Sequence, residues 1–146
     1  MGLRSLFSNT PTVALFVDGP NVLRDEFDVD LDDVRDAADD VGRLVATRLY
    51  LDAHAPSGLI QAAEARGYEV TITSGDVDVK LAVDAAELLV DDPPGVFVIA
   101  SRDTDFKPVV ELANRRGVRT LALAPGEHGR SDALGNAAQD ALTLDE

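Results

Sequence analysis

The segment from Val96 to Phe106 constrains the fold most strongly, because a short apolar run leads directly into two carboxylates. The apolar half, Val-Phe-Val-Ile-Ala, follows a turn at Pro93-Pro94-Gly95 and is typical of a buried parallel strand. The polar half carries Asp103 and Asp105, one residue apart. Because ligands in an open α/β sheet bind beyond the carboxyl ends of central strands, this segment predicts a polar site at one edge of a sheet.

A second apolar segment ends in the same way. Residues 13–17 lead into Asp18-Gly19-Pro20-Asn21, whose glycine and proline are turn residues. Two parallel strands that both end in aspartate place those aspartates at the same edge of the sheet. We therefore expect Asp18 and Asp103 to converge.

Apolar segments alternate with helical patterns along the whole chain. The predicted strands are 12–17, 43–51, 68–73, 96–100 and 118–124, with a terminal strand at 141–144. Three of the predicted helices are 31–40, with Asp30 as its cap, 56–66 and 105–116. A further helix, between residues 66 and 105, is indicated by the spacing of residues 79, 83, 86 and 90. The last predicted helix is short, begins with Ser131 as its cap and ends near residue 138.

This alternation predicts an α/β fold. A parallel sheet of about five strands is expected to carry helices on both faces, joined by right-handed crossovers. By length the chain is one domain. We assign residues 1–11 to an N-terminal arm and residues 12–146 to that domain.

Composition excludes several classes of protein. Cysteine is absent, which excludes disulfides, thiolate zinc sites and a cysteine nucleophile. No apolar stretch reaches the roughly 18 residues of a membrane span, and the first ten residues contain no apolar signal-peptide core, so a cytoplasmic protein without membrane contact is expected. No glycine-rich nucleotide loop follows a strand, so a nucleotide cofactor is not expected.

The chain is strongly acidic, with 27 Asp and Glu against 13 Lys and Arg and a net charge of -14. We interpret the acidic runs, such as residues 25–40, as a solvated surface adapted to a cytoplasm rich in salt, where screening weakens the repulsion. The melting temperature should then rise with added KCl, and a melting curve indifferent to KCl would contradict the interpretation. The alternative is a surface that repels anionic partners, so that phosphate binding needs local arginines or a bound metal.

Two further aspartates belong to the third predicted helix. Asp78 lies near its start, and Asp84 lies within an Ala-rich apolar run, where an unpaired carboxylate is costly to bury. With Asp18, Asp103 and Asp105 they form a set of oxygen ligands that suits Mg²⁺ or Mn²⁺, ions that activate water in phosphodiester cleavage. Simpler interpretations exist: Asp78 and Asp105 are able to cap helices, and Asp18 and Asp103 are compatible with ordinary acidic loops.

Polar and basic side chains accompany the acids. Ser101 directly precedes them, and its hydroxyl is expected to orient a carboxylate or to contact phosphate, since no nucleophile elbow surrounds it. Arg102 and Lys107 provide a local basic patch. The alternative for these two residues is a pair of ordinary exposed charges.

Three motifs, in this order, resemble the NYN domain of the PIN-like nuclease superfamily. They are Phe16-Val17-Asp18-Gly19-Pro20-Asn21, Val77-Asp78-Val79-Lys80-Leu81-Ala82-Val83-Asp84-Ala85 and Ser101-Arg102-Asp103-Thr104-Asp105-Phe106. The resemblance spans residues 13–144. It implies a Rossmann-like three-layer fold with strand order 3-2-1-4-5 and a metal-dependent ribonuclease site.

Carried over by position, the resemblance implies a role for each motif residue. The residues that would hold Mg²⁺ or Mn²⁺ and form the catalytic set are Asp18, Asp84, Asp103 and Asp105. Those that would support them are Asn21, Asp78, Ser101 and Thr104, and those that would contact substrate phosphate are Arg102 and Lys107. The chain departs from the family pattern at Gly75-Asp76, where Lys-Gly is frequent, and at Arg102, where Gly is frequent, which affects substrate preference more than fold.

Two hypotheses from different classes follow. The first is an endoribonuclease that cleaves RNA with Mg²⁺ or Mn²⁺ held by the aspartates. The second is an NYN-like RNA-binding or regulatory module with an idle acidic site, motivated by the negative surface and the missing extended basic patch. A receiver-type phosphoacceptor domain ranks below both, because no lysine follows the fifth predicted strand. A homo-oligomer is compatible with either hypothesis.

Overall fold

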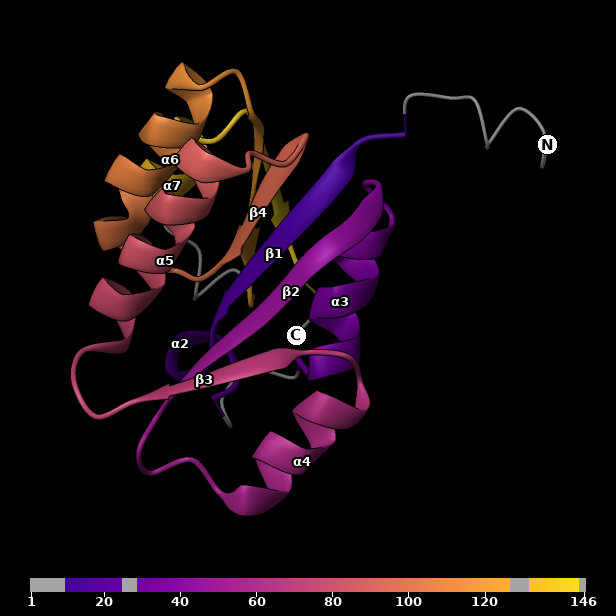
Figure 1. Cartoon of the computed structure of the whole chain (residues 1–146), viewed down its shortest axis with the longest axis vertical. Helices are drawn as coiled ribbons and strands as arrows, with labels where there is room; N and C mark the ends of the chain where they lie inside the picture. Colours follow the sequence, from indigo (N-terminus) through magenta and orange to yellow (C-terminus); the bar gives the residue numbers. More distant parts are fainter. Residues whose placement is uncertain (1–9, 25–28, 127–131, 145–146) are drawn as a thin grey trace, which may run out of the picture.

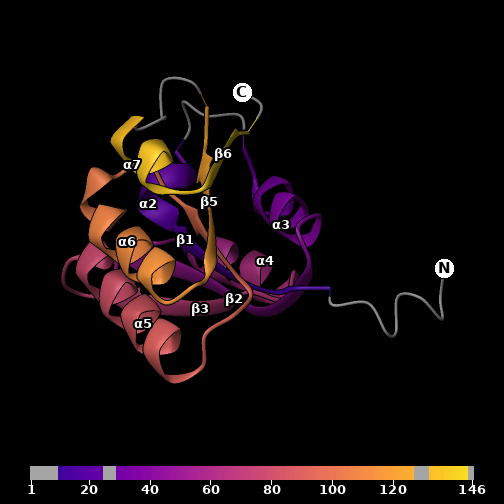
Figure 2. The ribbon, with the colours of Figure 1, turned by 90° about the horizontal axis from the view of Figure 1, so that it is seen from above.

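A parallel sheet organises the described part of the chain, which comprises residues 10–24, 29–126 and 132–144 of the computed structural model. Its strands are β1 (Thr12–Asp18), β2 (Arg43–Asp52), β3 (Glu69–Thr73), β4 (Val96–Ala100), β5 (Arg119–Ala124) and β6 (Asp140–Thr143). Within these residues the strands form one sheet in the order β3-β2-β1-β4-β5-β6, and every neighbouring pair is parallel (Figure 1 for β1 to β4, Figure 2 for β5 and β6).

Helices cover both faces of the sheet. They are α2 (Gly19–Val22), α3 (Leu31–Asp39), α4 (Ser57–Ala65), α5 (Val77–Asp91), α6 (Lys107–Arg115) and α7 (Asp132–Ala137), with a 3-10 turn η1 (Thr104–Phe106) before α6. Helices α3 and α4 lie on one face, and α5, α6 and α7 lie on the other (Figure 2). The predicted three-layer α/β fold is confirmed, as is the strand order, to which β6 is added beside β5.

Strand β1 lies near the centre of the sheet and divides its side chains between two apolar cores. Val13, Leu15 and Val17 pack with α3 and α4, whereas Ala14 and Phe16 pack with α5, α6 and α7. All five side chains are fully buried. This two-sided burial explains why the strand is an unbroken apolar run and not an alternating one.

The chain turns sharply at the carboxyl end of β1. A Cβ atom on Gly19 would lie 2.4 Å from Leu51 Cδ2 and 2.6 Å from the Tyr50 carbonyl oxygen, so glycine alone permits this approach to β2. Pro20 occupies the first turn of α2, where its missing N–H costs no helical hydrogen bond. The predicted turn at residues 18–21 is therefore the start of a one-turn helix, which holds its residues at the sheet edge.

The predicted helix at 105–116 is divided into η1 and α6. Asp103 caps η1 by accepting a hydrogen bond from the Asp105 N–H at 2.9 Å, and Pro108 lies in the first turn of α6. Gly117 then ends α6 with a φ of 76°, a left-handed conformation that glycine adopts without strain. The end of the helix agrees with the predicted bound at residue 116 to within one residue, and the division places Asp103 and Asp105 on a tight turn at the sheet edge.

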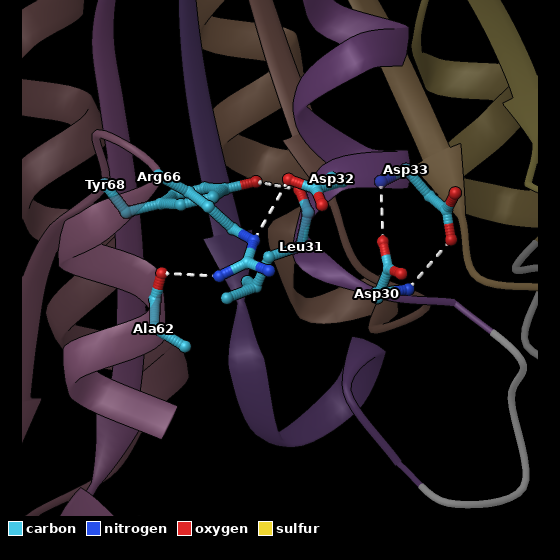
Figure 3. A network of polar contacts seen from close by, with 7 residues as sticks. All are labelled: Asp30, Leu31, Asp32, Asp33, Ala62, Arg66 and Tyr68. Atoms are coloured by element: carbon cyan, nitrogen blue, oxygen red, sulfur yellow. Dashed lines mark hydrogen bonds and ion pairs between the residues drawn. The ribbon is translucent and has the colours of Figure 1, made fainter. Parts of the chain in front are cut away.

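The predicted cap of α3 is confirmed as a reciprocal capping box. The Asp33 N–H donates to Asp30 Oδ1 and the Asp30 N–H donates to Asp33 Oδ2, both at 2.9 Å (Figure 3). The same figure shows Arg66 bound to Asp32 at 3.0 Å, and the Tyr68 hydroxyl donating to a backbone carbonyl of α3 at 2.8 Å. Part of the acidic run at 25–40 thus stabilises α3 and fastens it to the α4–β3 segment.

Helix α5 packs against the sheet through Leu81, Ala85 and Leu89, which are fully buried. The residues whose spacing predicted this helix lie elsewhere on it, because Val79 and Val83 are 57% and 60% exposed. The helix is therefore correctly predicted, but the valines that indicated it do not contribute to the core.

Some predictions lie outside the described residues. The N-terminal arm at 1–11 falls mostly on residues 1–9, and Ser131, the predicted cap of the last helix, is also outside. Helix α7 and strand β6 match the predicted final helix and strand to within about two residues. No helix in the described ranges has both the length and the apolar character needed to cross a membrane.

Candidate active site

The carboxyl end of β1 carries a buried carboxylate. Asp18 is 2% exposed and is the last residue of the strand. Its Oδ2 atom accepts two hydrogen bonds, one from Asn21 Nδ2 at 2.8 Å and one from the Ser101 hydroxyl at 3.2 Å. Asn21 lies in α2 and Ser101 directly follows β4, so this single oxygen joins the ends of the two central strands.

The segment after β4 is ordered by a chain of hydrogen bonds. Ser101, also 2% exposed, accepts a hydrogen bond from the Asp103 N–H at 3.0 Å through its hydroxyl oxygen. Asp103 in turn accepts from the Asp105 N–H. The serine hydroxyl therefore orients a carboxylate, which is one of the two roles predicted for it.

Helix α5 brings a third carboxylate to this edge. One carboxylate oxygen from each of Asp78, Asp103 and Asp105 lies within 4.8 Å of the other two. Asp78 is in the first turn of α5, while Asp103 and Asp105 flank the start of η1. Residues about 25 positions apart in sequence thus form an acidic cluster, defined here as these three residues, at the edge where Asp18 is buried.

The acids repel one another electrostatically. Burial is the largest cause that raises the pKa of Asp18, the hydrogen bonds from Asn21 and Ser101 oppose it, and the charges of Asp103 and Asp78 add to it. The charge of Asp103 is the main cause that raises the pKa of Asp105. A set of oxygen donors whose ionised forms are mutually unfavourable fits a hard divalent cation, which would relieve the repulsion.

Asp84 lies apart from the acidic cluster. Its Oδ2 accepts a hydrogen bond from the Tyr50 hydroxyl at 2.8 Å, and its Oδ1 accepts one from Lys80 Nζ at 3.0 Å. These two partners explain why a carboxylate is tolerated in an otherwise apolar segment. Of the four aspartates predicted to hold metal, the structure brings Asp103 and Asp105 together with Asp78, which was predicted as a support.

Tyr50 binds Asp84 and is not among the residues that the three motifs identify. Its ring is fully buried and stacks on Phe16 with 5.9 Å between ring centroids. Burial, and next the hydrogen bond to Asp84, raise the pKa of Tyr50 well above its ordinary value, so the hydroxyl remains a donor. A tyrosine inside an apolar strand was the available signal, since a buried hydroxyl needs a partner.

Arg102 orients the asparagine that supports Asp18. Its Nε donates to Asn21 Oδ1 at 2.8 Å, which directs the Asn21 amide nitrogen toward Asp18. Asn21, Arg102, Asp103 and Thr104 line an open depression of about 390 Å³. Thr104 and Lys107 are exposed beside it, at the starts of η1 and α6.

Comparisons with known proteins agree with this architecture. A family model described as "NYN domain" matches residues 12–145. The uncharacterized protein MJ0482 of Methanocaldococcus jannaschii is 40% identical over 134 residues, which cover 92% of this chain and 55% of the relative, so the chain spans about half the length of that protein.

A crystal structure of the protein of unknown function VPA0982 from Vibrio parahaemolyticus superposes with a TM-score of 0.78, covering 95% of this chain and 96% of the other. At 22% identity it supports the fold alone. The family model covers nearly the whole chain, and Asp18, Asp78, Asp103 and Asp105 lie at one edge of the sheet. The chain therefore belongs to the NYN domain family.

Proposed function

We propose that this protein is a divalent-metal-dependent endoribonuclease. The observation that carries the proposal is the approach of Asp78, Asp103 and Asp105 to within 4.8 Å of one another in an NYN domain. Carboxylates at such separations are costly to keep ionised without a counter-charge. The same edge carries the buried Asp18 and an open depression beside it, which leaves room for a chain substrate.

The donor set supports Mg²⁺ or Mn²⁺ as the cation. Asp78, Asp103 and Asp105 would hold it, with Asp18 adding a buried negative charge from the end of β1. When bound, such a cation polarises phosphate oxygens and lowers the pKa of water. Carboxylate-only donors favour these hard ions over zinc or copper, which prefer nitrogen and sulfur.

The surrounding side chains would hold the carboxylates and the substrate in place. Asn21 and Ser101 hold Asp18 through its Oδ2 atom, and the Ser101 hydroxyl also fixes the backbone of Asp103. Lys80 and Tyr50 hold Asp84 farther along α5. Arg102 and Lys107, on the rim of the site, would bind the anionic RNA backbone in a chain that is otherwise strongly acidic.

The two aspartates of α5 should differ in importance. We expect Asp78→Asn to reduce metal-dependent RNA cleavage at least ~100-fold, because it removes a carboxylate of the acidic cluster. Asp84→Asn is its matched control, and it should cost less than about 10-fold, because Tyr50 is able to donate to the amide oxygen. Initial cleavage rates of both variants test whether Asp78→Asn loses more activity than Asp84→Asn. A larger loss in Asp84→Asn would contradict this prediction.

Arg102 should contribute to RNA binding through phosphate. We expect Arg102→Ala, placed in an Asp103→Asn background to prevent cleavage, to weaken binding of single-stranded RNA. The slope of log K against log salt should become shallower by about 0.7, the value for one lost phosphate contact. Arg115→Ala, at the exposed end of α6, is the control and should leave the slope unchanged. Equal slopes for both variants would remove Arg102 from the proposed substrate site.

A circular RNA tests the endonucleolytic reaction directly. Wild-type protein with Mn²⁺ or Mg²⁺ should convert the circle to linear RNA, which no exonuclease is able to do. Circular RNA that is bound but never opened, with either ion and a folded protein, would instead favour an RNA-binding or regulatory module.

A further inference from the structure

Helix α5 exposes a row of apolar side chains that neither the core nor the acidic cluster uses. Val79, Val83 and Val90 are 57%, 60% and 48% exposed, and Ala86 lies between them. They supply half of the six large hydrophobic side chains that are exposed in the described part of the chain. We call these four residues the valine stripe. Such a concentration on one helix face marks an interaction surface.

The centre of the valine stripe is rotated by about 130° around α5 from the centre of the buried face. At 100° per residue, positions 79, 83, 86 and 90 fall on the side of α5 away from Leu81, Ala85 and Leu89. Figure 2 places α5 at the outer edge of its helical layer, beside α6, and the three valines of the stripe are exposed. The stripe is therefore available to another molecule.

The residues of the valine stripe have the spacing found where two helices pack against each other in a coiled coil. Its intervals of four, three and four residues are the alternation of a and d positions in a coiled coil. The stripe is about 16 Å long, and β-branched valine fits the knobs-into-holes packing of two helices. A partner that presents one helix with the same spacing would therefore be complementary.

We propose that the valine stripe pairs two copies of this chain, with their α5 helices antiparallel about a two-fold axis. The stripe has the same intervals read in either direction, so Val79 meets Val90 of the partner subunit and Val83 meets Ala86 of the partner subunit. A two-fold interface requires such self-complementarity.

Charge complementarity selects the antiparallel arrangement. Lys80 and Glu87 both flank the valine stripe on the same side and occupy equivalent heptad positions. Antiparallel helices bring Lys80 close to Glu87 of the partner subunit, twice by symmetry. Parallel helices would instead place e positions against g positions of the partner, which here are Ala82 and Leu89, so neither Lys80 nor Glu87 would gain an ion pair. Lys80 is half exposed, so it is able to face the partner while bound to Asp84 of its own helix.

Salt should strengthen the dimer. Each chain carries a net charge of -14, so two copies repel one another at low ionic strength, and screening lowers that repulsion. RNA binding should show the opposite response, since phosphate contacts weaken with salt. Because one pair of 15-residue helices forms a small interface, we expect a reversible dimer with Kd on the order of micromolar.

Sedimentation equilibrium of the full chain, over a range of protein concentrations at low and high KCl, tests the proposal. The wild type should approach twice the monomer mass as KCl rises. Val83→Glu should raise the dimer Kd at least about 30-fold, since it places a charge at the centre of the pair. Val45→Glu, an equally exposed valine on β2, is the matched control and should leave Kd unchanged.

A charge exchange tests the orientation. Lys80→Glu and Glu87→Lys should each weaken the dimer, and the double variant should restore it, because the interacting pairs are then regenerated. A wild type that stays monomeric at every concentration and salt, or a dimer that Val83→Glu does not weaken, would overturn the proposal. None of these outcomes depends on nuclease activity, so the dimer and the proposed function fail or succeed separately.

Discussion

Replacing Asp103 by Asn is expected to abolish metal-dependent cleavage, with a loss of at least ~100-fold in rate. The variant loses one of the three carboxylates that converge within 4.8 Å, and with it the charge that opposes a cation there. The fold should persist, because Asp103 also caps η1 and Asn caps helical turns about as well as Asp. Activity and structure are therefore separable at this position.

The control for Asp103→Asn is Asp91→Asn, which removes the same charge from the exposed end of α5 away from the site. It should retain the wild-type rate. Circular dichroism and thermal melting should show both variants folded. An Asp103→Asn protein that is folded and cleaves RNA at the wild-type rate would remove Asp103 from the catalytic site.

Replacing Asp18 by Asn should have two opposite effects, a loss of cleavage and a gain in stability without metal. Burial raises the pKa of Asp18, so the ionised carboxylate costs free energy in the folded state. Both of its hydrogen bonds end on Oδ2, so an amide oxygen in that place keeps them. We expect a gain of about 1 kcal/mol, or roughly 3 °C in Tm, without added metal.

The effect of Asp18→Asn on stability should depend on pH. Because the folded pKa of Asp18 lies above its ordinary value of 3.8, the unfolded chain releases this proton first as pH rises. Asp18 therefore lowers the stability of the wild type as pH rises through its folded pKa, and the variant lacks this contribution. The difference in Tm should be largest near neutral pH and should shrink as pH falls toward 3.8.

Melting curves with EDTA across this pH range measure the effect. With added Mn²⁺ the wild type should melt at a higher temperature than Asp18→Asn, since a cation that binds the folded wild type stabilises it. An Asp18→Asn protein that melts below the wild type at neutral pH in EDTA would show that the buried carboxylate stabilises the fold.

The sequence was sufficient to predict the sheet and two of the strand ends, because these depend on local patterns. The apolar runs that end in Asp18 and in Ser101-Arg102-Asp103 can be recognised from the sequence alone. The parallel pairing of β1 with β4 then brings the polar ends of the two runs together. The sequence did not show which of Asp78 and Asp84 lies next to Asp103 and Asp105. Both lie on α5, about 9 Å apart along the helix, and their different partners, Asp103 and Asp105 for one and Tyr50 for the other, come from distant parts of the chain.

The sequence also did not show which face of α5 packs against the sheet. The helix carries apolar residues on two different faces, with Leu81 and Ala85 on one and Val79 and Val83 on the other. Both sets have helical spacing, so periodicity identifies the helix without showing which face meets the sheet. Tyr50 was missed for a related reason, because its partner Asp84 is 34 residues away in sequence.

The most direct test of the proposed nuclease is the initial rate at which the wild-type protein cleaves a labelled single-stranded RNA at high KCl, with Mn²⁺, Mg²⁺ or EDTA. High KCl is chosen because the acidic surface is expected to need screening. We predict internal cuts that require one of the two ions and stop in EDTA. Cleavage that continues in EDTA, or no cleavage by folded protein with either ion, would contradict this prediction.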